Sequence, residues 1–140
     1  MVRIVIYTDG AARGNPGPSA SGYDIYRDGA EATRGAKYNG MATNNFAEYN
    51  AVILALEWCI RNMKDHGKCD VELYSDSELV VKQLNGRYKV KSAAMKPLHF
   101  EAESLASRFG SIEFRNLPRE DQHIKEVDAR LNRLLDRIGH

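Results

Sequence analysis

The chain has 140 residues, 43% of them hydrophobic and 28% charged, with a formal net charge of +1. This size and composition predict a single globular domain over residues 1–140 and exclude a disordered chain or a fold that depends on disulfides. Two cysteines lack metal-ligand spacing, no signal-peptide pattern is present, and no apolar run approaches the ~20 residues of a membrane span. We therefore expect a cytoplasmic protein that is monomeric and makes no membrane contact.

The first third of the chain predicts three antiparallel strands. Residues 4–8 form an apolar, β-branched run that ends at a polar turn pair. The following stretch, 10–22, is rich in glycine, proline, serine and alanine, and it predicts a tight loop. Residues 22–27 and 31–37 flank an Asp-Gly pair, which is a strong signal for a two-residue hairpin.

Helical periodicity then begins. Asn45 predicts an N-cap, with Glu48 three residues later as in a capping box, and His66-Gly67 predicts the end of this helix. The apolar residues between these signals recur at spacings of three and four, which predicts one buried face. They are Phe46, Tyr49, Ile53, Leu56, Ile60 and Met63.

Strands and helices alternate in the second half of the chain. Residues 71–75 predict a strand, and residues 78–84 predict a short helix that is stopped by Asn85-Gly86. Pro97 predicts the start of another helix, and residues 112–117 predict the last strand. Apolar residues at helical spacing then mark a C-terminal helix: Val127, Leu131, Leu134, Leu135 and Ile138.

The order of these elements predicts an α/β fold with a mixed five-stranded sheet flanked by helices. Three strands come first, followed by parallel additions, because a strand–helix–strand unit calls for a right-handed crossover and parallel pairing. In such sheets ligands bind beyond the carboxyl ends of the parallel strands, near a switch in strand order.

Four acids fall at strand ends or helix starts. Asp9 and Asp76 follow the first and fourth strands, Glu48 lies in the first turn of the long helix, and Asp128 lies near the start of the last helix. If the first and fourth strands are parallel neighbours, these acids meet at one edge of the sheet. Carboxylates crowded without counter-charge suit hard divalent cations such as Mg²⁺. Two such ions about 4 Å apart promote in-line attack on a phosphodiester.

Each acid also has a local explanation. Asp9 is part of a turn signal, Asp76 is a possible helix N-cap, and Glu48 is half of a capping box. Asp128 is an acid favoured by the helix dipole. Each local explanation competes evenly with the site when the acid is considered alone, whereas the four together favour a shared site.

The same acids lie in a family pattern. The chain resembles ribonuclease HI, the type 1 ribonuclease H, in four motifs that arrive in the family's order and span nearly the whole chain. These motifs are residues 7–18 (YTDGAARGNPGP), 43–49 (TNNFAEY), 74–77 (YSDS) and 118–120 (PRE) followed by Asp128 and Asn132.

The resemblance implies a fold, an activity and a set of metal ligands. The fold would be a five-stranded mixed sheet flanked by helices, in agreement with the predicted elements. Asp9, Glu48, Asp76 and Asp128 match the family's catalytic, metal-binding acids. The implied activity is endonucleolytic hydrolysis of the RNA strand of RNA–DNA hybrids with two Mg²⁺ ions, or Mn²⁺, leaving 3′-hydroxyl and 5′-phosphate ends.

Substrate recognition requires groups that read the RNA 2′-hydroxyl, which both donates and accepts hydrogen bonds. Short polar side chains and closely approaching backbone meet this need. Arg13, Gly14 and Asn15 offer such groups, and the resemblance implies that Asn15, Asn44 and Asn45 lie near the sugars and Thr43 near a phosphate of the DNA strand. Many family members carry a long basic insertion where this chain has only residues 85–97, so we expect a reduced protrusion that Lys89 and Lys91 partly replace.

His123 is a candidate for proton transfer or product release, because histidine titrates near neutral pH and the family often has a loop histidine upstream of the last acid. The interval from Pro118 to Asp128 departs from the family pattern, since the predicted loop 121–126 is about two residues longer than the comparable loop in family members. A solvated histidine is the alternative.

Other functions remain open from the sequence. A proofreading exonuclease or recombinase of the same superfold shares clustered carboxylates but lacks the 14–17 loop and the Asn44-Asn45 pair. Double-stranded RNA is an alternative substrate. A non-catalytic hybrid-binding module or a docking role would leave the four acids without purpose.

Overall fold

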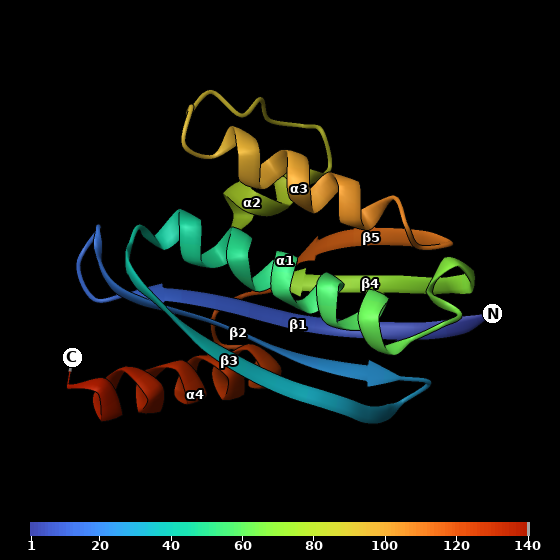
Figure 1. The fold of residues 1–140 in the computed structure, drawn as a ribbon, viewed down its shortest axis with the longest axis horizontal. Helices are drawn as coiled ribbons and strands as arrows, with labels where there is room; N and C mark the ends of the chain where they lie inside the picture. The colour runs from blue at the N-terminus through green and yellow to red at the C-terminus, as the bar shows by residue number, and fades with distance from the viewer. Residues whose placement is uncertain (140) are drawn as a thin grey trace.

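The computed structural model describes residues 1–139, and His140 lies outside the described residues. Five strands and four α-helices follow the predicted order, with one short 3₁₀ helix before the fourth strand (Figure 1). The elements are β1 (Val2–Ala12), β2 (Gly17–Arg27), β3 (Ala30–Ala42), α1 (Asn44–Asn62), η1 (His66–Lys68), β4 (Cys69–Ser75), α2 (Glu78–Leu84), α3 (Lys96–Ala106), β5 (Ser111–Asn116) and α4 (Gln122–Ile138).

The strands form one mixed sheet in the order β3-β2-β1-β4-β5. β1 pairs antiparallel with β2 and parallel with β4, so the sheet changes from antiparallel to parallel pairing at β1. In the register of β1 and β4, Thr8 lies opposite Ser75, and each of these residues directly precedes one of the predicted acids. The predicted parallel pairing is therefore confirmed, and it brings Asp9 and Asp76 to the same edge of the sheet.

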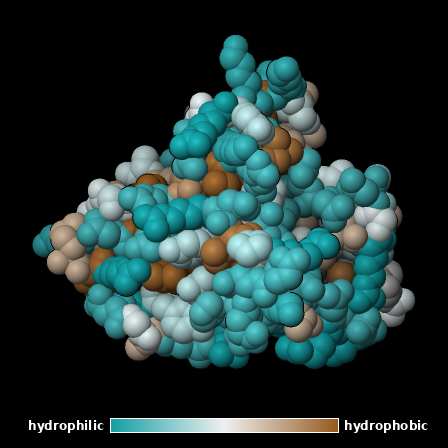
Figure 2. Space-filling view, turned by 180° about the vertical axis from the view of Figure 1, so that it is seen from behind, coloured by the Kyte–Doolittle hydropathy of each residue, from teal (hydrophilic) through white to brown (hydrophobic). Residues whose placement is uncertain are grey.

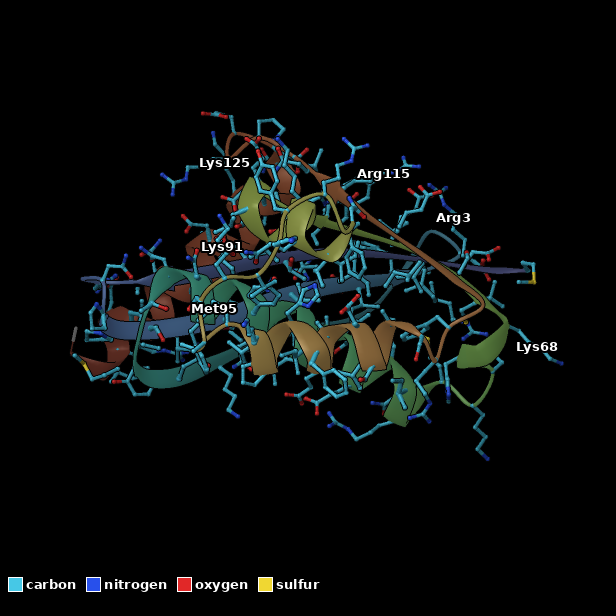
Figure 3. All side chains as sticks on the ribbon, turned by 90° about the horizontal axis from the view of Figure 1, so that it is seen from above. Arg3, Lys68, Lys91, Met95, Arg115 and Lys125 are labelled. Atoms are coloured by element: carbon cyan, nitrogen blue, oxygen red, sulfur yellow. The ribbon has the colours of Figure 1, made fainter. Side chains whose placement is uncertain are left out.

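Helices cover both faces of the sheet. Helices α1 and α3 lie on one face, and α4 crosses the other (Figures 1 and 3). The main core lies between α1, α3 and the sheet, with large buried side chains such as Tyr49, Leu56 and Leu73. A smaller buried cluster, Ala20, Leu131 and Leu135, packs beneath α4. Figure 2 shows the α4 face as mostly hydrophilic, with apolar residues visible only as small separate patches.

Close packing of α4 depends on a glycine in β2. A Cβ atom at Gly22 would lie 2.7 Å from Leu131 Cδ2 and 3.1 Å from Val127 Cγ1. Gly22 pairs with Asp9 across the strands, so the same missing side chain lets α4 approach the sheet beside the first acid. This packing determines how near Asp128 can come to the site.

Several local predictions are wrong. Helix α1 ends at Asn62 rather than at His66-Gly67, and Glu48 is its fifth residue rather than part of its first turn. The stretch 10–22, predicted to be a loop, is mostly strand. β1 continues to Ala12 and β2 begins at Gly17, which leaves only a four-residue turn between them. The N-cap of α1 is Thr43, whose side chain accepts a hydrogen bond from the Phe46 N–H. The predicted 121–126 loop is helical from its second residue, because the Asp121 side chain caps α4 by accepting two backbone N–H groups.

The connection between α2 and α3 contains neither helix nor strand over residues 85–95. Within residues 1–139, no helix combines the length and apolar character that crossing a bilayer would require.

Candidate active site

The first acid is held where α1 touches β1. Asp9 is 4% exposed and follows Thr8 on β1, and the next residue, Gly10, lies directly against the backbone of Ala47 and Glu48 in α1. A Cβ atom at Gly10 would fall 2.3 Å from the carbonyl carbon of Ala47 and 2.4 Å from the Glu48 nitrogen. Only glycine allows this approach, and the approach lets the Gly10 N–H donate to Glu48 Oε1 at 2.6 Å.

Asp76 follows β4 and is not the cap of the next helix. Ser77 caps α2, its hydroxyl accepting from the Val80 N–H at 3.3 Å, so the N-cap alternative for Asp76 is excluded. One carboxylate oxygen from each of Asp9, Glu48 and Asp76 lies within 4.8 Å of the others. The sheet register and the α1–β1 contact therefore bring together three acids that are far apart in the sequence.

The fourth acid approaches this triad from α4. Asp128 lies in the second turn of α4 rather than at its start. It is not part of the triad, but it lies close enough to Asp9 for its charge to raise the pKa of that carboxyl group. Asn132, one turn further along, donates its side-chain N–H to Asp128 Oδ2 at 3.2 Å. All four predicted acids thus lie at one end of the sheet.

Electrostatic repulsion and burial both act on this cluster. Burial raises the pKa of Asp9 to about 9, and the negative charges of Asp76 and Asp128 contribute to the rise. Burial likewise raises the pKa of Glu48, with further contributions from the charges of Asp9 and Asp76. The Gly10 N–H opposes the rise at both carboxyls. Such shifts are typical of groups that a fold holds together for a chemical role.

The donor set fits a hard divalent cation. Asp76 Oδ1 is buried and has no hydrogen-bond partner within the described part of the chain. The nearest cation to Asp76 is Arg119, whose Nε lies 3.8 Å from Oδ2 on a side chain that is 88% exposed. Oxygen-only ligands that lack internal counter-charge match the preferences of Mg²⁺ and Mn²⁺.

The turn at residues 13–16 lies against the start of α1. Asn15 Oδ1 accepts from the Asn44 N–H at 3.0 Å, and Asn44 Oδ1 accepts from the Ala12 N–H at 3.0 Å. Gly14 has φ +103°, a conformation that favours glycine, and the Asn15–Pro16 peptide bond is cis. Exposed Gly14, Asn15, Asn44 and Asn45 therefore form one polar surface at the start of α1, the polar ledge, and Thr43 next to it is half-buried.

Arg13 has a different environment from the rest of the turn. Its guanidinium group contacts α4, where it bonds Asn132 and forms an ion pair with Asp136. The sequence prediction placed Arg13 among the substrate contacts, and its contacts within the chain were not expected.

Lys89 and Lys91 are exposed in the 85–95 connection. Together with Leu79, Arg87 and Tyr88 they line a surface hollow of about 420 Å³. Figure 3 shows Lys91 and Met95 in this connection between α2 and α3. The hollow offers positive charge next to an exposed aromatic ring, a combination that suits a polyanion such as a nucleic-acid backbone.

His123 lies in the first turn of α4. Its ring stacks on Tyr7, with ring centres 4.1 Å apart, and meets Tyr26 edge-on. Its Nδ1 is buried without a hydrogen-bond partner among the described residues. Tyr7 precedes Asp9 by two residues on β1, so His123 lies on the same face of that strand as the first acid.

Sequence reasoning missed two residues that contact the site. Asn132 and Arg119 were recognised as parts of a motif without a role, yet they contact Asp128 and Asp76. The i, i+4 spacing of Asp128 and Asn132 on one helix is the signal that indicates the first contact.

Comparison with known proteins agrees with this geometry. The RNase H family model matches residues 1–117, which include Asp9, Glu48 and Asp76. Ribonuclease HI of Halobacterium salinarum is 38% identical over 135 residues, which cover 96% of this chain and 65% of that protein. A bifunctional protein of Mycobacterium tuberculosis is 37% identical over 84% of this chain but only 32% of its own length. The chain thus spans about two thirds of one curated relative and one third of the other.

Solved structures resemble the chain over nearly its full length. The crystal structure of the Halobacterium RNase H1 superposes with a TM-score of 0.86 at 38% identity, covering 96% of this chain and 98% of that one. LC11-RNase H1, isolated from compost by a metagenomic approach, was solved in complex with an RNA/DNA hybrid. It gives a TM-score of 0.88 at 36% identity, with 96% and 98% covered. The sequence match, the shared fold and the acid cluster together show that this chain belongs to the ribonuclease H family.

Proposed function

We propose that this chain is an endonuclease that hydrolyses the RNA strand of RNA–DNA hybrids, using two Mg²⁺ ions and leaving 3′-hydroxyl and 5′-phosphate ends. The observation that carries the proposal is the carboxylate triad, in which one oxygen from each acid lies within 4.8 Å of the others where the parallel pairing of β1 and β4 ends. The hybrid bound by LC11-RNase H1 supports the choice of substrate.

Asp9, Glu48, Asp76 and Asp128 would hold the metal ions. Bound there, the ions would lower the pKa of an attacking water and stabilise charge on the leaving oxygen. The protein's own contribution is placement: Glu48 is oriented by the Gly10 N–H, and Asp128 is oriented by Asn132. No serine, cysteine or histidine nucleophile is needed in this scheme.

The polar ledge would distinguish RNA from DNA. Asn15 and Asn44 are fixed by hydrogen bonds to backbone, which leaves their remaining donors and the exposed Gly14 backbone beside the acids. In our proposal these groups, with Thr43 and Asn45, contact the sugars and phosphates of the bound duplex, and a 2′-hydroxyl in the RNA strand supplies the partner that DNA lacks.

Three labelled duplexes of equal sequence test this function: an RNA–DNA hybrid, a DNA duplex and an RNA duplex, each with and without Mg²⁺ or Mn²⁺. We expect cleavage of the hybrid RNA strand only, dependent on the metal and absent from the Asp9→Asn variant. Cleavage of DNA would favour an exonuclease or recombinase activity, cleavage of the RNA duplex would widen the substrate, and binding without cleavage would indicate a non-catalytic module.

The same preparation tests the oligomeric state of the protein. We propose that the chain acts as a monomer in the cytoplasm, and sedimentation at assay concentrations measures the first of these directly. A dimer would contradict it.

A further inference from the structure

Arg13 joins the 13–16 turn to helix α4. Its Nη2 atom donates to the Asn132 backbone carbonyl at 3.2 Å and to Asn132 Oδ1 at 3.3 Å, and lies 2.7 Å from Asp136 Oδ1. All three contacts are made by this one nitrogen, and only 30% of the arginine side chain is exposed. A side chain engaged in this way is poorly placed to act chiefly as a contact for a nucleic-acid phosphate.

Asn132, which Arg13 contacts, in turn contacts Asp128, one of the candidate metal ligands. Arg13 fixes the side-chain oxygen of Asn132, which leaves the amide nitrogen to donate to Asp128 Oδ2 at 3.2 Å and to the Asp128 carbonyl at 3.1 Å. The orientation of the amide is thereby determined, since a flipped amide would face Arg13 with its own donors. Arg13 thus keeps the amide nitrogen of Asn132 directed at Asp128, and the hydrogen bond from that nitrogen orients the Asp128 carboxylate.

The same turn is attached to α1 on its other side. Asn15 accepts from the Asn44 N–H, and Asn44 belongs to the first turn of the helix that carries Glu48. One short turn therefore connects the two helices that supply Glu48 and Asp128. Asn15 is also a proposed reader of the RNA strand, so substrate contacts and metal-ligand contacts meet within three residues.

We propose that Arg13 and Asn132 are positioning residues that orient Asp128 beside the carboxylate triad, so that they set the affinity of the site for its metal ions and link it to binding of the RNA strand. The proposal rests on the hybrid-cleaving function for its second half only. Residues that orient metal ligands in this way change metal affinity by roughly 10–100-fold when they are removed. Because linkage is reciprocal, hybrid binding should lower the Mg²⁺ concentration required, and Mg²⁺ should tighten hybrid binding.

The stability of the fold should depend little on these contacts. Asp136 is 68% exposed, and exposed ion pairs contribute about 0–1 kcal/mol. Removal of the Arg13 charge should therefore leave the melting temperature of the metal-free protein nearly unchanged, which separates a positioning role from a purely structural one.

The test uses Arg13→Gln and Asn132→Ala, with Arg133→Gln as the matched control. Arg133 is exposed on the same helix next to Asn132, so its replacement removes the same charge without touching Asp128. Three quantities are measured for each protein: the rise in melting temperature with Mg²⁺ alone, the Mg²⁺ concentration that gives half-maximal cleavage of the hybrid, and KM for the hybrid at saturating Mg²⁺.

We expect both site variants to require roughly 10-fold more Mg²⁺ in the first two measurements, with KM at saturating Mg²⁺ changed less than about 2-fold. Arg133→Gln should match the wild type. A raised KM with unchanged Mg²⁺ dependence in Arg13→Gln would make Arg13 a direct substrate contact and overturn the proposal. Unchanged values in both variants would also overturn it. If the wild type failed to cleave the hybrid, the proposed function would fail, while the Mg²⁺-induced melting shift would still report on the positioning of Asp128.

Discussion

The Gly10 N–H donates to Glu48 Oε1 at 2.6 Å because Gly10 has no side chain to keep β1 away from the backbone of Ala47 and Glu48 in α1. This contact joins the strand that carries Asp9 to the helix that carries Glu48. It also provides the backbone donor that partly offsets the crowding of negative charge at both carboxyls.

Replacement of Gly10 by alanine should therefore disrupt the site and the fold together. The new Cβ atom would overlap backbone atoms of Ala47 and Glu48, and overpacking costs about 1–3 kcal/mol even where side chains can adjust. We expect a loss at the upper end of this range, measured by urea unfolding, and a large fall in hybrid cleavage. Gly67→Ala is the control, since its Cβ would meet only Arg108 O at 3.8 Å. Equal stability of the two variants would contradict the close approach of α1 to Gly10.

Asp9→Asn should abolish cleavage and stabilise the metal-free protein. The loss of one preorganised charged group typically costs at least ~10²-fold in turnover. The pKa of Asp9 is raised from 3.8 to about 9 in the folded protein, so between these pH values the unfolded chain has released a proton that the folded chain retains. Stability of the metal-free wild type consequently falls as pH rises through this window.

The stabilisation by Asp9→Asn should therefore be small at pH 5 and larger at pH 8, measured as the difference in melting temperature in EDTA. A gain of roughly 1–2 kcal/mol at pH 8 would correspond to about 3–8 °C for a domain of this size. Glu101→Gln, at an exposed position on α3, should show no such trend. Added Mg²⁺ should raise the melting temperature of the wild type more than that of Asp9→Asn. A pH-independent difference would argue against repulsion within the cluster.

Reversal of charge at Lys89 and Lys91 should raise KM for the hybrid with little change in kcat. Both residues are exposed and line a hollow that includes none of the four acids, so they would contribute phosphate contacts rather than chemistry. The effect should be largest at low salt, and the salt dependence of KM should become shallower. Lys68→Glu is the control, because Figure 3 shows Lys68 at one end of the molecule and well separated from Lys91. An unchanged KM at low salt would remove both lysines from the substrate-binding surface.

His123→Ala tests whether the histidine acts in proton transfer or only in packing. Loss of its stacking on Tyr7 should cost about 0.5–1.5 kcal/mol of stability in either case. A catalytic contribution predicts in addition a several-fold fall in kcat and a change in its dependence on pH near neutrality. His123→Phe keeps a stacking ring and should restore stability without restoring that pH dependence. Full turnover across the pH range would limit His123 to packing.

The sequence by itself was sufficient for the order of the elements, because periodicity and turn residues are local signals. The hairpin at Asp28-Gly29 and the short helix ended by Asn85-Gly86 both lie where the pattern predicted them. The family was also accessible, since the four motifs keep their order along nearly the whole chain. Boundaries were less certain: the run of small residues at 10–22 looks like a loop, although alanine and glycine there are paired in strands across the sheet.

Only the tertiary structure decided which acids share a site and what orients them. The sheet register places Asp9 beside Asp76, and the missing side chains at Gly10 and Gly22 set how closely α1 and α4 approach. The contacts of Arg13 with Asn132 and Asp136 join residues more than a hundred positions apart, and no local sequence pattern encodes such contacts. Packing distances between elements, rather than the identity of single residues, determine these contacts.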